Sequence, residues 1–161
     1  MQLIPSILLS LCLGLSQSDQ PAYTWAVDHG ATNAMVSAAI AAQDRTSVEA
    51  STLLALAYCE SSYKPNARGD GGRSKGLMQI QSCWYDELSE ELGEVFNPDD
   101  PEQAIFGAAY ILLWLGWQPD EDSQLKALAR YNGSRRINRH ARKVWRIRGE
   151  IINEQAGDTG R

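Results

Sequence analysis

The stretch from Leu53 to Gln81 constrains this chain more than any other, because it joins an apolar helix to a glycine-rich polar turn. The helical part is apolar on nearly all sides, which is typical of a helix buried at the centre of a domain. Its one acidic residue, Glu60, comes at the end, where polar residues begin. A carboxyl group that enters an apolar wall beside a polar cleft can keep its proton and act as a general acid. We therefore expect Glu60 to carry the chemistry.

The rest of the sequence predicts a mainly α-helical domain with one small β element beside Glu60. Apolar residues recur at helical spacing in most segments, whereas residues 66–74 gather glycine and aspartate and predict a hairpin or compact loop. The expected helices span residues 23–43 with a break at Gly30, 47–62, a segment that ends at Leu92, a segment that starts at Pro101 and ends before Gly116, 123–131 and 137–153.

The two ends of the chain are expected to lie outside the domain. Residues 3–15 are apolar and uncharged, and a small-x-small site follows at residues 16–18, so residues 1–18 resemble an export signal. An uncleaved membrane anchor is the alternative, although the apolar run is shorter than the roughly 20 residues of a spanning helix. We expect a monomeric domain over residues 19–155, a flexible tail over 156–161, no stable anchor after cleavage, and a periplasmic or extracellular location.

Export would place the cysteines in an oxidising compartment, where disulfides persist. Once Cys12 leaves with the signal, Cys59 and Cys83 remain on either side of the central turn. A bridge between them would stabilise the fold by roughly 3 kcal/mol. Two free thiols are the alternative.

Charge and histidine content exclude some functions. The formal net charge of −5 and the absence of a nucleic-acid motif argue against a nucleic-acid partner. The two histidines, His29 and His140, lie far apart with no ligand spacing around them, so we predict no metal and no cofactor.

Three ordered motifs resemble the lytic transglycosylases of the soluble type. They are Glu60-Ser61 with Gly76-Leu77-Met78-Gln79-Ile80, Asn97-Pro98 with the helix after it, and Ala127 to Gly133, which includes Tyr131-Asn132. The resemblance covers about residues 47–144. It departs from the family between Glu60 and Gly76, where the segment is one residue longer, and at Gln81-Ser82, where the family often has methionine-proline.

This resemblance implies a small lysozyme-like fold and a substrate, the glycan strands of peptidoglycan. It implies that Glu60 is the single catalytic acid and that the substrate is contacted by Ser61, Ser74, Gln79, Tyr131 and Asn132. In this family the acid protonates the bond between N-acetylmuramic acid and N-acetylglucosamine. It then takes the proton of the C6 hydroxyl of the sugar, which leaves a 1,6-anhydro end.

Two alternatives stay open. Asp70, in the glycine-rich turn, could be a second carboxylate that activates water, which would make the chain an inverting muramidase; an aspartate between glycines is also a common turn former. The other alternative is a wall-binding or assembly component without enzymatic function. Small exported domains of this type accompany secretion and conjugation machines, and others are carried by phages, so such a machine or a virion is a candidate partner.

Overall fold

The computed structural model describes residues 23–157, and these form seven α-helices and a small three-stranded sheet. The expected export signal and residues 158–161 of the expected tail lie outside the described residues. The helices are α1 (Thr24–Asp28), α2 (Asn33–Thr46), α3 (Ala50–Ser61), α4 (Tyr85–Leu92), α5 (Pro101–Trp114), α6 (Glu121–Tyr131) and α7 (Arg139–Gly157). This confirms the predicted mainly α-helical class.

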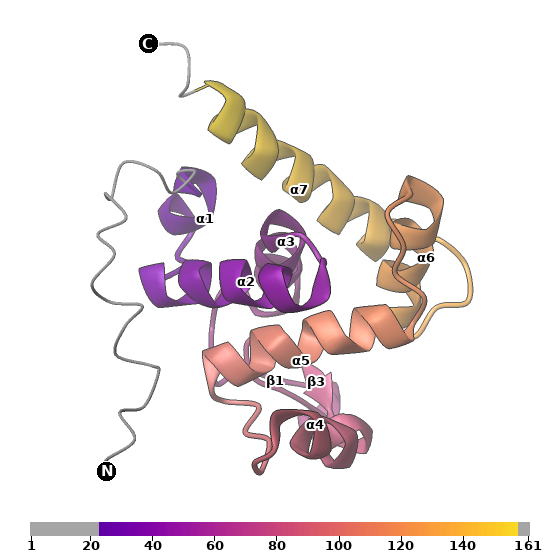
Figure 1. The fold of residues 1–161 in the computed structure, drawn as a ribbon. Coiled ribbons are helices and arrows are strands. Elements are labelled where there is room, and N and C mark those ends of the chain that lie inside the picture. Colours follow the sequence, from indigo (N-terminus) through magenta and orange to yellow (C-terminus); the bar gives the residue numbers. More distant parts are fainter. Residues whose placement is uncertain (1–22, 158–161) are drawn as a thin grey trace, which may run out of the picture.

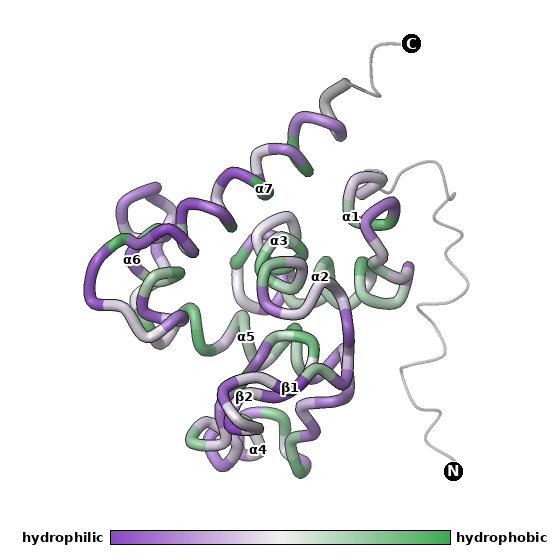
Figure 2. The backbone as a smooth tube through the Cα atoms, turned by 180° about the vertical axis from the view of Figure 1, so that it is seen from behind, coloured by the Kyte–Doolittle hydropathy of each residue, from purple (hydrophilic) through white to green (hydrophobic). Residues whose placement is uncertain are grey.

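Helix α3 is the centre of the fold. It packs against α2, α5 and α7, and residues 50–57 are all buried. Figure 1 shows α7 crossing α3 on one side and α5 passing on the other, and Figure 2 shows the apolar colouring of α3 in the middle of the molecule. An apolar helix with no solvent-facing side needs such cover, so the all-round apolarity of this segment is explained.

The small β element lies directly after α3, as predicted. Strands β1 (Arg68–Gly69), β2 (Ser74–Lys75) and β3 (Ile80–Gln81) form an antiparallel sheet in the order β1-β2-β3. Gly69 pairs with Ser74, and Ser74 pairs in turn with Gln81. A 3-10 turn, Asp70–Gly72, joins the first two strands, and a second one, Ser82–Trp84, leads into α4.

Several predicted helix boundaries are confirmed and others are wrong. Gly30 separates α1 from α2, and Pro101 begins α5 behind Asp100, whose side chain accepts a hydrogen bond from the Gln103 amide at 3.0 Å. Ser47 does not begin the next helix: it adopts φ 61° and closes α2. A left-handed residue at this point satisfies the end of the helix before it.

The last helix is also longer than predicted. Helix α7 begins at Arg139, behind Asn138, whose side-chain oxygen accepts from the Ala141 amide at 2.9 Å. It continues to Gly157, so the first two residues of the expected tail are helical. Within residues 23–157, no helix is both long enough and apolar enough to cross a membrane.

Candidate functional site

Glu60 lies on the last turn of α3, where the helix leaves the core. Its side chain is 12% exposed. The helix ends one residue later, at Ser61, because Ser62 and Tyr63 both adopt positive φ, at 52° and 61°. The carboxyl group is therefore held at the end of a buried helix with little exposure to solvent, which is the setting expected of a general acid.

Glu60 lines a pocket of about 320 Å³ that lies between α3, the sheet, α5 and the end of α6. Nearly all the substrate-contacting residues named by the resemblance line this pocket, although they are up to 72 positions from Glu60. The lining includes Glu60, Gly69, Asp70, Ser74, Gln79, Trp84, Ile111, Leu115, Arg130, Tyr131 and Asn132. The prediction that these segments meet at one site is consistent with this arrangement.

Ser61 is the one predicted contact that does not line the pocket. Its hydroxyl donates to the Ala57 carbonyl at 3.2 Å and accepts from the Lys64 amide at 3.2 Å. Both bonds complete the end of α3, where carbonyl and amide groups lack helical partners. The side chain of Ser61 therefore serves the helix end next to the acid.

Tyr131, the last residue of α6, lines the same pocket as the acid. Its hydroxyl donates to the Met78 carbonyl at 2.8 Å, which ties α6 to the turn between β2 and β3. Burial, together with the nearby charge of Glu60, raises the pKa of Tyr131 well above its usual range. The tyrosine thus stays protonated and acts as a neutral wall. Asn132 follows it at the rim, and its side-chain oxygen accepts from Asn138 at 3.2 Å.

Gln79 is fixed within the turn by backbone and side-chain contacts. It adopts φ 50°, and its side-chain nitrogen donates to the Gly76 carbonyl at 2.9 Å. Its side-chain oxygen lies only 2.3 Å from where a Cβ on Gly69 would be. Gly69 therefore leaves the space that Gln79 needs to lie across the sheet toward the pocket.

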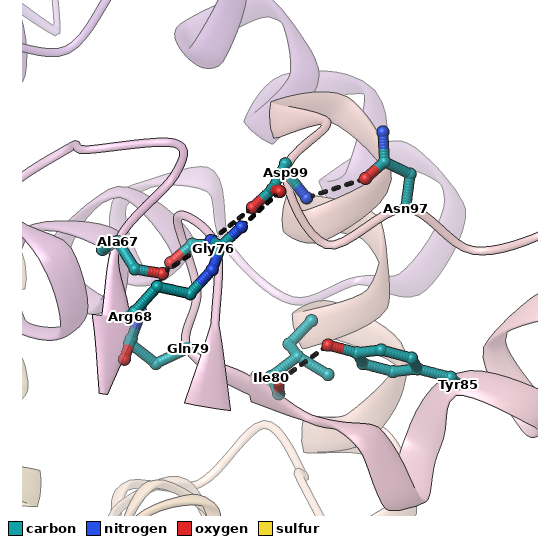
Figure 3. A network of polar contacts seen from close by, with 8 residues as sticks. All are labelled: Ala67, Arg68, Gly76, Gln79, Ile80, Tyr85, Asn97 and Asp99. Carbon is teal, nitrogen blue, oxygen red and sulfur yellow. Dashed lines mark hydrogen bonds and ion pairs between the residues drawn. The ribbon is translucent and has the colours of Figure 1, made fainter. Parts of the chain in front are cut away.

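Strand β1 and the turn between β2 and β3 are both anchored to the loop before α5, as Figure 3 shows. Arg68 makes two hydrogen bonds to the carboxylate of Asp99, at 2.7 and 2.6 Å. These bonds lower the pKa of Asp99. Gly76 lies so close to this loop that a Cβ would be 1.7 Å from the Pro98 carbonyl oxygen. The loop thus fixes the position of the segment that carries Gln79.

Asp70 lies in the pocket wall and also in the turn. Its Oδ2 accepts a hydrogen bond from the hydroxyl of buried Ser74 at 2.7 Å, and its own φ is 50°. This bond closes the loop between β1 and β2, as expected of a turn-forming aspartate. Asp70 is exposed and also lines the pocket, and its role as a second carboxylate stays a prediction.

His140, for which the sequence suggested no role, is the one ionisable side chain within ion-pair distance of the acid among the described residues. Its Nε2 lies 3.2 Å from Oε1 of Glu60, and its side chain is 20% exposed. Within residues 23–157, neither of these two atoms nor Nδ1 of His140 has a hydrogen bond of good geometry. A buried polar atom without a partner costs free energy, so the stability of this arrangement depends on both side chains being present.

A sequence signal for His140 did exist. Val144, Ile147 and Ile151 are buried residues of α7, and His140 continues the same stripe one turn earlier. Residues at this spacing share one face of a helix. The stripe therefore predicts that His140 faces inward, although it does not predict that Glu60 is its neighbour.

The predicted disulfide between Cys59 and Cys83 is not formed, and both residues are free thiols. Cys59 lies on the side of α3 that faces α7, near Lys143, whereas Cys83 is exposed and lies beside Trp84 and Trp114. The two thiols thus face different surroundings. Burial raises the pKa of Cys59 to about 11, which leaves it protonated and unreactive near neutral pH.

Comparison with known proteins identifies the family of this chain. A search of curated proteins gives no match. The model of the family described as "Transglycosylase SLT domain" matches residues 37–150, from α2 through most of α7, and includes every residue of the pocket. The match covers well over half of the chain and confirms a lysozyme-like helical domain. This chain belongs to the transglycosylase SLT domain family.

Proposed function

We propose that this chain is a peptidoglycan lytic transglycosylase in which Glu60 acts first as acid and then as base. Its family indicates a glycan-cleaving enzyme that acts on peptidoglycan, and therefore one that works in the periplasm or outside the cell. The observation that carries the proposal is the position of Glu60, a nearly buried carboxyl group at the only point where α3 meets the described pocket.

The proposed reaction needs one carboxyl group. Protonated Glu60 gives its proton to the oxygen that links N-acetylmuramic acid to N-acetylglucosamine, and the bond from that oxygen to C1 breaks. The C6 hydroxyl oxygen of the same muramic acid then bonds to C1, and its proton passes to the Glu60 carboxylate. The product is a 1,6-anhydro sugar. Since the proton returns to Glu60, no water is consumed and the acid is ready for another turnover.

His140 has a positioning role in this proposal. Its ring nitrogen lies beside Oε1 of Glu60, and this leaves Oε2 as the oxygen available to the substrate. An imidazole next to the carboxyl group can hydrogen-bond it and so hold it in one orientation.

The hydrolase is the second candidate because Asp70 lines the same pocket. In an inverting enzyme this carboxylate would activate a water molecule on the far side of the sugar. Its hydrogen bond from Ser74 and its place in the turn favour a structural role instead.

One digest distinguishes these candidates. Purified peptidoglycan is treated with the wild type, Glu60→Gln and Asp70→Asn, and the products are weighed by mass spectrometry. The proposal expects products one water lighter than reducing muropeptides, absent with Glu60→Gln and present with Asp70→Asn. Reducing ends that require both carboxylates would establish the muramidase. A wild type without products, in a protein whose biological role survives Glu60→Gln, would establish a binding or assembly component.

A further inference from the structure

A second hollow of about 200 Å³ adjoins the pocket of Glu60. It is lined by Cys83, Trp84, Glu87, Tyr110 and Trp114. Trp84 lines both hollows. On α5, Ile111 belongs to the first and Trp114 to the second, so the end of this helix runs along both. A ligand that leaves the Glu60 pocket along α5 therefore passes over Trp84 and meets Trp114.

Trp114 is unusual among the tryptophans of the chain because it is 69% exposed. Trp25 and Trp117 are buried in the core, and Trp145 lies against the Arg148 guanidinium. The ring of Trp114 nonetheless has a fixed neighbour: its centroid is 5.0 Å from that of Trp84, with the two planes at 82°. Such an edge-to-face contact orients an aromatic ring. The exposed indole face is thus presented in a defined direction.

The chemistry of this hollow fits a sugar. The C–H groups on one face of a pyranose ring are apolar and pack on an indole face, while its hydroxyl and amide groups need polar partners. Glu87 is the one charged residue of the lining and can accept hydrogen bonds from such groups. A carboxylate would repel the anionic lactyl and peptide groups of muramic acid. The lining therefore favours an uncharged N-acetylhexosamine.

We propose that Trp84 and Trp114 form an additional glycan subsite, which binds a neutral N-acetylglucosamine unit beyond the Glu60 pocket. The proposal rests on the proposed function for its substrate class. A pocket of about 320 Å³ is at the small end of ligand sites, so a polymeric strand must continue outside it. The tryptophan pair would give the glycan strand an apolar surface at the point where the strand leaves the pocket.

The test is binding of chitohexaose, an uncharged β-1,4-linked N-acetylglucosamine oligomer, to the Glu60→Gln protein by titration calorimetry. Added to this background, Trp114→Ala is expected to weaken binding by about tenfold, and Trp114→Phe by less. Leu113→Ala is the matched control, because Leu113 is the neighbouring exposed apolar residue, 39% exposed, and lines neither hollow. It should leave the affinity unchanged.

Two results would overturn the subsite: no binding of chitohexaose by the Glu60→Gln parent, or equal affinities for Trp114→Ala and Leu113→Ala. The second would mean that the exposed indole serves another partner. Failure of the proposed function is a separate result. A wild type that binds the oligomer through Trp114 but releases no anhydro products would keep the subsite and reject the transglycosylase.

Discussion

Glu60 lies between two regions that are built differently. On one side are α3 and α7, which carry buried apolar residues and place the imidazole of His140 beside the acid. On the other side is the small sheet, where strands of two residues are held by glycines, by Gln79 and by a contact with the loop before α5. In the proposed mechanism, the helical side positions the carboxyl group of Glu60, and the sheet side shapes the space for the sugar. Substitutions in the two regions should therefore impair different properties of the protein, its activity on the helical side and its stability on the sheet side.

The largest effect is expected at Glu60 itself. Glu60→Gln removes the proton donor while keeping the size of the side chain, so cleavage should fall by about a thousandfold or more. The thermal midpoint should change little, because the amide can still face His140. The rate of release of soluble muropeptides measures the first effect, and circular dichroism the second. Residual activity within tenfold of the wild type would remove Glu60 from the mechanism.

On the sheet side, Gly76→Ala should mainly reduce stability. The new Cβ would lie 1.7 Å from the Pro98 carbonyl oxygen in a backbone with φ 78°, so we expect a loss of about 3 kcal/mol or more in the free energy of unfolding. Gly71→Ala is the matched control, because Gly71 also has positive φ, 66°, but has open space around its Cβ position.

The control should lose only about 1 kcal/mol in urea unfolding. Equal losses for Gly71→Ala and Gly76→Ala would mean that the close contact with Pro98 does not fix the turn.

On the helical side, His140→Ala should reduce kcat by about tenfold to a hundredfold with little change in KM, because the variant leaves Glu60 in place but without its neighbour. His140→Gln, which can still hydrogen-bond the carboxyl group, should recover part of the loss. A change in KM alone would instead indicate a role in binding.

The two free thiols should differ in reactivity, an effect confined to their own surroundings. At pH 8, Cys83 should react with iodoacetamide well before Cys59, because Cys83 is exposed and burial raises the pKa of Cys59 to about 11. Mass spectrometry of tryptic peptides reads each site separately. Failure of both thiols to react before reduction would restore the disulfide predicted from the sequence.

The smallest effect is expected at the Arg68–Asp99 pair, which is exposed. The hydrogen bonds from Arg68 lower the pKa of Asp99, so any stability the pair adds is present above the ordinary aspartate range and is lost as pH falls through the lowered pKa. Asp99→Asn should change the thermal midpoint by no more than about 2 °C at pH 7. Its midpoint should also converge with that of the wild type in acid; a gap that widens there would reverse the sign of this linkage.

The sequence was most informative where one local segment sets the outcome. The apolar run before Glu60, the glycine-rich turn and Pro101 each predict a local structure that is present. Ser47 was assigned to the wrong helix because a serine can begin one helix or end another, and only its positive φ decides. The disulfide was inferred from export and from the pair of cysteines that remains after the signal, and neither says in which direction each thiol points.

The contact between Glu60 and His140 shows why part of the site could not be predicted. The two residues are 80 positions apart, and their approach depends on how α7 crosses α3. Helical spacing predicts that His140 faces inward, but many inward positions meet only apolar residues. The neighbour is set by helix packing, which follows from the shapes of all the side chains between the two helices.

In the proposed mechanism, Glu60 uses the substrate's own hydroxyl group and no water. A digest of peptidoglycan in oxygen-18-labelled water, followed by mass spectrometry of the new glycan ends, tests this step. We expect 1,6-anhydro ends that carry no label. Reducing ends with one labelled oxygen at C1 would show that water attacks the sugar, and the mechanism would then be wrong.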